Sequence, residues 1–145
     1  MNLEYGPEYE DFRAEVIDFC KEYEGISFEN TSSKNISRSE WQKILIEKGF
    51  IARAIPKEYG GFGGETDIIK SRIIATEFSK AKIPGGMGGQ GIDMLVPTLL
   101  EWGTEEQKQQ YIQPTLHGEM IWCQGYSEPN ALSLIHISEP TRLRS

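Results

Sequence analysis

Histidine and cysteine are both scarce in this chain, and their scarcity narrows the kinds of site that it can hold. The 145 residues include two cysteines, Cys20 and Cys123, and two histidines, His117 and His136. Two such cysteines do not make a disulfide framework, and no His/Cys cluster has the spacing of metal ligands. We therefore expect no metal site and a reducing setting. Cys20 lies on the apolar side of a predicted helix, which indicates a small buried hydrophobe.

Basic charge and long apolar runs are lacking too. Lys and Arg number 15 against 22 Asp and Glu, so the formal net charge is -7. Nucleic-acid binding needs a basic patch, which argues against that class of function. No run approaches the roughly 20 apolar residues that cross a bilayer. The acidic N-terminal stretch MNLEYGPEYEDF has neither the basic nor the apolar region of a secretory signal, and its acidity argues against a transit peptide; we expect a cytoplasmic protein.

What the chain does have is helical periodicity. Residues 8–23 carry apolar side chains at helical spacing, with charges on the other face: Phe12, Val16, Phe19, Cys20 and Tyr23. The second predicted helix begins behind a capping box formed by Ser37 and Glu40, and it ends at Gly49. Its expected buried stripe is Trp41, Ile44 and Leu45.

Two more helices are predicted between the glycine-rich stretches. The third covers about 66–81, with apolar or small residues aligned along it: Ile69, Ile73 and Thr76, and beside them Ile74 and Phe78. The fourth covers 92–102, and Pro97 is expected to kink it. Trp102 at its end, like Trp41, is expected in the core.

The fifth predicted helix, 105–116, begins behind a second capping box formed by Thr104 and Gln107. Glu105 and Glu106 fall in its first turn, where carboxylates favour the helix dipole.

The remaining isolated titratable residues have ordinary structural explanations. Asp93 is expected to be a first-turn charge of its helix rather than a group facing a pocket. His117 is expected to be a turn residue rather than a general base.

The pattern changes after the fifth helix. Residues 119–129 are aromatic-rich and closed by proline, which predicts a first β-strand. A lone strand cannot satisfy its own backbone, so further strands normally follow. We therefore divide the chain into a helical domain at 1–118 and the start of a β-domain at 119–131.

Two glycine-rich stretches invite a phosphate or nucleotide interpretation. GMGGQG, residues 86–91, matches G-x-G-x-x-G, but no strand precedes it and no acidic residue follows at the right distance. A flexible approach to a helix is favoured, and close backbone contact with a ligand stays a hypothesis. PKEYGGFGG, residues 56–64, lacks the Lys-Ser/Thr of a P-loop, so a sharp turn packed on neighbouring helices is favoured over a phosphate cradle.

Three motifs, taken in order, are more specific than any one alone. IPKEYGGFGG is similar to a Pro-x-Glu-Tyr-Gly-Gly turn, GTEEQKQQYIQPTLHGE to a Gly-Thr-x-Glu-Gln-Lys-x-x-Tyr-x-x-Pro helix, and IWCQGYSEPNA to the beginning of a flavin signature, Ser/Thr-Glu-Pro-x-Ala-Gly-Ser-Asp. These are motifs of the acyl-CoA dehydrogenase family, the flavoenzymes that desaturate acyl-CoA thioesters, and the chain resembles that family over roughly residues 7–131. The WCQGYSEP stretch is closest to bacterial members acting on bulky or unusual acyl groups.

The resemblance implies a mainly α fold: an N-terminal helical bundle of acyl-CoA dehydrogenase type plus the first strand of a truncated β-barrel-like domain. It implies FAD as cofactor, with Ser127 as a flavin hydrogen-bond partner. Backbone contacts to the flavin are expected from Gln124, Gly125 and Tyr126. The residues expected to line the acyl thioester chain are Gly88, Gly89, Gly91 and Ile92.

The last 14 residues depart from the family pattern. After Ala131 the family continues Gly-Ser-Asp, whereas this chain reads LSLIHISEPTRLRS at 132–145. That string resembles the translated read-through of a transposase adapter used to build sequencing libraries, so we interpret it as non-native. The alternative is a genuine divergent C-terminus. An independently prepared library would distinguish the two.

The resemblance also implies a chemistry for the complete protein. In the family, a carboxylate base from the C-terminal domain removes the α-proton while a hydride leaves Cβ for the flavin. Fatty-acid metabolism, an electron-transfer flavoprotein as acceptor and a homo- or hetero-oligomer are implied as well. The chain itself, without the catalytic glutamate and most of the FAD site, is expected to be inactive. Two alternatives stay open: a non-catalytic helical partner subunit or interaction module, and an acyl-CoA oxidase.

Overall fold

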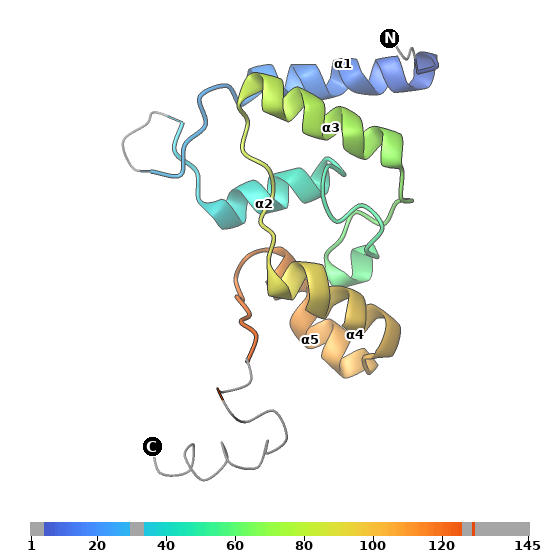
Figure 1. Ribbon diagram of the computed structural model, residues 1–145, viewed down its shortest axis with the longest axis vertical. Helices are drawn as coiled ribbons and strands as arrows, with labels where there is room; N and C mark the ends of the chain where they lie inside the picture. The colour runs from blue at the N-terminus through green and yellow to red at the C-terminus, as the bar shows by residue number, and fades with distance from the viewer. Residues whose placement is uncertain (1–4, 30–33, 126–128, 130–145) are drawn as a thin grey trace.

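The computed structural model describes residues 5–29, 34–125 and 129. Within these residues the chain forms five α-helices, a 3-10 turn (η1) and a π-helical turn (η2): α1 Pro7–Glu22, α2 Arg38–Glu47, η1 Lys57–Tyr59, α3 Ile68–Ala81, η2 Gly91–Leu95, α4 Val96–Trp102 and α5 Glu105–Leu116. Helices α1 and α3 lie side by side at one end, α4 and α5 pack together at the other, and α2 lies between (Figure 1). The expected mainly helical architecture is confirmed. None of the helices in these ranges is long and apolar enough to span a membrane.

Both predicted capping boxes are present, and they explain where two helices begin. The Glu40 N–H donates to Ser37 Oγ at 3.1 Å, and the Ser37 N–H donates to a Glu40 carboxylate oxygen at 3.0 Å. Thr104 and Gln107 form the same reciprocal pair ahead of α5, at 3.2 and 3.0 Å. Each box satisfies two N–H groups that a helix start would otherwise leave without partners.

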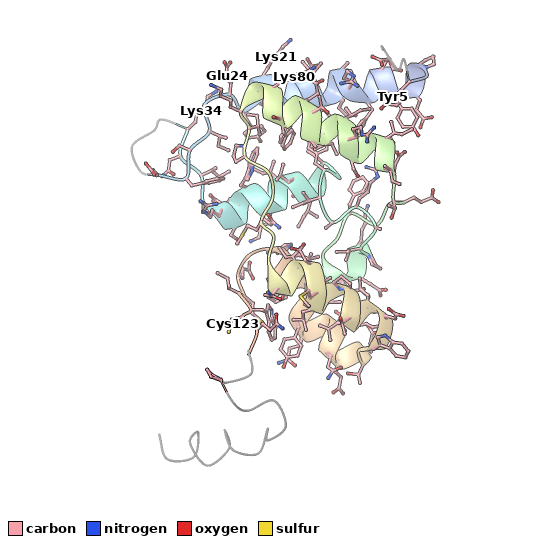
Figure 2. The ribbon with its side chains drawn as sticks, viewed as in Figure 1. Tyr5, Lys21, Glu24, Lys34, Lys80 and Cys123 are labelled. Atoms are coloured by element: carbon pink, nitrogen blue, oxygen red, sulfur yellow. The ribbon has the colours of Figure 1, made fainter. Side chains whose placement is uncertain are left out.

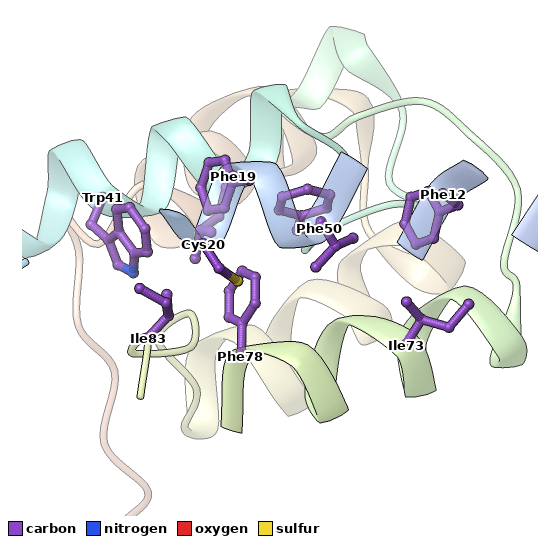
Figure 3. Packing of buried hydrophobic residues seen from close by; sticks show 10 residues of the cluster. Phe12, Phe19, Cys20, Trp41, Phe50, Ile73, Phe78 and Ile83 are labelled. Carbon is purple, nitrogen blue, oxygen red and sulfur yellow. The ribbon is translucent and has the colours of Figure 1, made fainter. Parts of the chain in front are cut away.

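The larger hydrophobic cluster joins α1, α2 and α3 through aromatic rings (Figure 3). Phe19 lies at its centre, with ring centroids 4.9 Å from Phe50, 5.7 Å from Trp41 and 5.9 Å from Phe78. Edge-to-face and stacked pairs at these distances are favourable beyond their buried area. Cys20 is 4% exposed beside them, so its predicted role as a small buried hydrophobe is confirmed.

A second cluster holds the other half of the molecule together. Its buried members come from α2, η1, α4 and α5: Ile46, Tyr59, Val96, Leu99, Ile112 and Leu116. Helix α2 therefore serves both clusters, because Trp41 and Leu45 belong to the first and Ile46 to the second. Ile44, expected in the buried stripe of α2, is only partly buried.

Two expected core residues lie elsewhere. Trp102 is 79% exposed. It follows Val96 by six residues, about 240° around the helix axis, so it leaves the face that packs on α5. Thr76 is exposed and Glu77 is buried instead. Glu77 lies only about 40° around α3 from the fully buried Ile73, which places its stem inside the interface with α1.

The helix that contains Pro97 is irregular in its backbone hydrogen bonds. The predicted helix 92–102 is split into η2 and α4, and the Val96 N–H bonds to the Gly91 carbonyl oxygen in π fashion. Because proline has no N–H, it cannot continue the regular ladder, and the irregular turn lies directly before it. This turn begins at the glycine-rich stretch that forms the candidate site.

Candidate functional site

A cleft of about 110 Å³ lies where the glycine-rich stretch meets the end of α5. All four residues expected to contact an acyl chain line it: Gly88, Gly89, Gly91 and Ile92. The opposite wall comes from Thr115 of α5 and from Gly118, Met120, Ile121 and Trp122 just after it. The structure thus brings together residues that lie about 25 positions apart in the sequence.

Two neighbouring side chains of α2 hold the glycine-rich stretch in place. The Trp41 indole N–H donates to the Pro84 carbonyl at 3.0 Å, and the Met87 N–H donates to Gln42 Oε1 at 2.8 Å. Gln42 is 1% exposed, so this bond is made away from water. Sequence reasoning missed Gln42, because a polar residue within a helix gives no sign of being buried.

The Asp93 carboxylate is occupied by a hydrogen bond within its own turn. Gly89 has a φ of 112°, a conformation that glycine adopts readily, and its N–H donates to Asp93 Oδ2 at 2.9 Å. Asp93 is therefore a first-turn charge, as predicted. None of the described residues that line the cleft is ionisable. Such walls suit the binding of an apolar chain and contribute no acid or base.

The predicted flavin-contact residues follow the cleft along the chain. Gln124 and Gly125 are exposed and do not line the cleft, and Tyr126 and Ser127 lie outside the described residues. Residues 121–125 form neither helix nor paired strand, whereas a strand was expected over 119–129. A strand requires a neighbour to pair with, and the described ranges offer none at this point.

Trp122 ties the segment after α5 back to that helix. Its indole N–H donates to Thr115 Oγ1 at 2.8 Å, and its ring meets the Tyr111 ring edge-on at 5.6 Å. Thr115 is 2% exposed and donates its own hydroxyl proton to the Tyr111 carbonyl at 2.6 Å. The sequence carried no signal for this pair beyond the aromatic character of the stretch.

A wider cavity of about 470 Å³ adjoins the other glycine-rich turn and is lined by Lys43, Lys57 and His117 among others. The turn does not cradle an anion, because its backbone donors are used within the turn: the N–H groups of 61, 62, 63 and 64 bond to carbonyls of 56, 52, 55 and 53. Gly60 packs directly on Gln113 of α5. The interpretation as a sharp turn packed on a neighbouring helix is confirmed.

His117 is the C-cap of α5, in accord with its predicted place in a turn. Burial lowers the pKa of its imidazole, and the nearby positive charge of Lys43 lowers it further. Lys43 itself is paired with Glu119 at 3.1 Å.

The Glu105 carboxylate also has a structural role, as a hydrogen-bond acceptor. Both its carboxylate oxygens accept from the Tyr59 hydroxyl, at 2.8 and 3.0 Å, which joins the glycine-rich turn to α5. That hydrogen bond, with burial and the carboxylate charge, raises the pKa of Tyr59 to about 12.

The two cysteines differ in their surroundings. Cys20 borders a cavity of about 280 Å³ at the end of α1 and α3, where Lys21, Glu24 and Lys80 gather (Figure 2). Burial raises the pKa of its thiol, which makes it a weak nucleophile. Cys123 is exposed on the segment after α5 (Figure 2). Within the described ranges no three His, Cys, Asp or Glu residues are grouped as a metal site would require.

Comparisons of this chain with family models and with known proteins point to the same family. The model of the "Acyl-CoA dehydrogenase, N-terminal domain" matches residues 6–119. The acyl-CoA dehydrogenase IpdE1 of Mycolicibacterium smegmatis is 35% identical over 107 residues, covering 73% of this chain and 27% of its own. A probable acyl-CoA dehydrogenase, YngJ of Bacillus subtilis, is 31% identical over 132 residues, covering 90% of this chain and 34% of its own.

A solved structure agrees. The ChsE4–ChsE5 complex of Mycobacterium tuberculosis superposes with a TM-score of 0.57 at 26% identity, over 90% of this chain and 33% of the matched one. The chain therefore spans between a quarter and about a third of the length of these relatives.

Proposed function

The chain belongs to the acyl-CoA dehydrogenase family, and on that premise we propose that it is the N-terminal part of an FAD-dependent enzyme that introduces a double bond between Cα and Cβ of an acyl-CoA thioester. The observation that carries the proposal is the cleft beside η2, whose described lining is without ionisable side chains. It lies within the part of the chain that matches the family's N-terminal domain.

The cleft supplies a wall for the acyl group. At Gly88 and Gly89 no side chain separates a ligand from the backbone, so an acyl chain can lie close to the main chain there, whereas the Gly91 backbone is covered by the side chains of Trp122 and Thr115. Ile92, Met120 and Trp122 add apolar surface. Burying methylene groups against such a wall stabilises binding by about 0.8 kcal/mol for each fully buried group. The substrate class we propose is therefore a thioester with an apolar acyl group.

The residues after the cleft fit a flavin. Gln124 and Gly125 are exposed, and apart from the two chain neighbours no described residue has an atom within 4 Å of where a Gly125 Cβ would stand, so a flat ring can approach the backbone there. We assign flavin backbone contacts to Gln124, Gly125 and Tyr126 and a hydroxyl hydrogen bond to Ser127. When bound, FAD supplies the hydride acceptor. The chain's own contribution is to orient the acyl group beside that segment and to exclude water from it.

Proton abstraction needs groups that the described residues around the cleft do not supply. The α-proton of a thioester is too weakly acidic for a carboxylate unless hydrogen bonds stabilise the charge that develops on the carbonyl oxygen. The described lining offers no carboxylate, and Asp93 and Glu105 are both held in structural hydrogen bonds. We place the base in the C-terminal part of the complete protein and expect no turnover from residues 1–145 alone.

The complete enzyme is proposed to act in the cytoplasm, in fatty-acid or related acyl breakdown, and to pass electrons to an electron-transfer flavoprotein. We also propose that it assembles as a homo- or hetero-oligomer. The ChsE4–ChsE5 complex supports this, because that relative is itself an assembly of two different chains.

The test begins with the native reading frame. The locus is recovered from an independently prepared library, and the uninterrupted protein is purified and its visible spectrum recorded. We expect flavin absorbance that bleaches when octanoyl-CoA or a bulkier acyl-CoA is added without oxygen, whereas the 145-residue chain shows neither property.

A flavin-free complete protein would overturn the proposal and favour a non-catalytic partner subunit. Rapid reoxidation of the bleached flavin by oxygen would indicate an acyl-CoA oxidase instead. Flavin absorbance and bleaching in the 145-residue chain would contradict the division of labour between this part and the rest.

A further inference from the structure

Trp122 is the one residue between 121 and 125 that is not exposed, while its neighbours on both sides are. Its indole N–H and its ring are both engaged on α5, through Thr115 and Tyr111. The Thr115 hydroxyl has a single proton, which goes to the Tyr111 carbonyl, so its lone pair is oriented to accept from the indole. The Trp122 indole therefore donates and Thr115 accepts, and the acceptor side chain is only 2% exposed.

The Trp122 indole also contacts the glycine-rich wall of the cleft, at Gly91. A Cβ placed on Gly91 would stand 2.5 Å from Trp122 Cδ1 and 2.9 Å from Thr115 Cγ2. Real Cβ atoms do not approach that closely, so the ring lies directly on the Gly91 backbone. Gly91 is buried and begins η2. Three parts of the chain, the glycine-rich stretch, the end of α5 and the segment leaving the helical domain, thus meet at one side chain.

We infer that Trp122 is a positioning residue: it fixes the segment that carries Gln124 and Gly125 relative to the acyl cleft. This inference rests on the proposed function, because the segment is assigned there to the flavin. A hydride moves only between atoms held close together and aligned, and small displacements of a reacting pair reduce the rate strongly. In the described part of the segment, Trp122 bonds to Thr115 of α5 and packs on the Gly91 backbone, so it ties the segment to both walls of the cleft.

An ordinary packed tryptophan would give a different signature. It would contribute to global stability and nothing more, so its loss would lower the melting temperature without loosening one segment selectively. The Thr115 hydroxyl allows the two roles to be separated. Thr115→Val removes the acceptor while keeping the shape of the side chain, and Thr115→Ser restores the hydroxyl.

The first measurement is 15N relaxation of the backbone amides of the 145-residue chain. Loss of the Trp122 tether is expected to lower the order parameters at 121–125 from about 0.85, typical of rigid backbone, to below about 0.6 in Thr115→Val and in Trp122→Phe. Order parameters of α1 and α3 are expected to stay as in the wild type. Thr115→Ser and the matched control Trp102→Phe, which changes an exposed tryptophan, are expected to leave those of 121–125 unchanged.

The second measurement uses the complete flavin-loaded enzyme. Thr115→Val is expected to shift the flavin absorption band and to slow bleaching by acyl-CoA at saturating substrate, and Thr115→Ser is expected to restore both. Unchanged order parameters at 121–125 in Thr115→Val overturn the inference. So do lowered order parameters with an unaltered flavin spectrum and bleaching rate, and in that case the proposed function stands. A wild-type enzyme without flavin would end the proposed function and this inference together.

Discussion

The ion pair between Arg13 and Glu77 joins α1 to α3, and its removal tests how that interface is stabilised. Arg13 Nη1 lies 2.7 Å from Glu77 Oε1, and the Glu77 side chain is only 9% exposed. Lys80 approaches the same carboxylate oxygen at 3.5 Å but is 68% exposed. Arg13 is therefore the partner that compensates a largely desolvated charge.

The expected magnitudes differ for each partner. Removing one member of a buried pair typically destabilises by about 3–5 kcal/mol. The Arg13 side chain is 25% exposed and Lys80 remains nearby, so for Arg13→Met we expect a loss of about 2 kcal/mol. Glu77→Leu leaves a partly solvated guanidinium and is expected to destabilise by less than about 1 kcal/mol. The double variant is expected to lie within about 1 kcal/mol of the wild type, because no buried charge is left alone.

Urea unfolding of the 145-residue chain, followed by circular dichroism, measures all four proteins of this cycle. In thermal melts of the same proteins, the loss in free energy for Arg13→Met should appear as a fall in melting temperature of about 5 °C. Lys80→Met is the control and should change stability by less than about 0.5 kcal/mol. A loss below that limit for Arg13→Met, or strictly additive losses in the double variant, would refute the reasoning that Glu77 is charged, buried and dependent on Arg13.

Three further predictions concern turns and caps. Gly61→Ala should lower the free energy of unfolding by about 2 kcal/mol in urea titrations, because a Cβ there overlaps the Ile55 carbonyl oxygen; Gly85→Ala, with no atom within 4 Å, should be neutral, and equal effects would contradict the packing. Thr104→Ala should cost about 1 kcal/mol in the same assay by uncapping α5, whereas Thr104→Ser should not. The pKa of Tyr59 is raised from 10.0 to about 12, so the stabilisation from its hydroxyl is complete below pH 10 and lost as pH rises from there toward 12. Thermal melts of Tyr59→Phe should show a flatter decline over that window, and an identical decline would disprove the role of the hydroxyl.

Local signals in the sequence predict most of the helical layout. The capping boxes at Ser37 and Thr104 set the starts of α2 and α5, because a cap is decided by residues three positions apart. The apolar stripe of α1 predicts its buried face for the same reason. The turn at 56–64 follows from its proline and glycines.

Interactions between distant segments account for what sequence reasoning missed. Glu77 is buried because Arg13, 64 positions away, lies opposite it, and Gln42 because Met87 needs an acceptor 45 positions away. Trp102 looked like core because it is large and apolar, but its angle around α4 decides its exposure.

The candidate site was predicted by resemblance more than by physics. Nothing in the spacing of Gly88 to Ile92 places these residues opposite Thr115 and Trp122. Their meeting depends on how η2 and α5 pack, which no local pattern encodes.

The double role of α2 limits how this domain can change over evolution. Leu45 and Ile46 are adjacent, yet they belong to different hydrophobic clusters, so both flanks of the helix are in use. Each residue added to or removed from a helix rotates everything beyond it by about 100°. A codon gained or lost within α2 would therefore misplace buried side chains in both halves of the domain at once, whereas a length change outside the helix would leave the spacing of Leu45 and Ile46 intact.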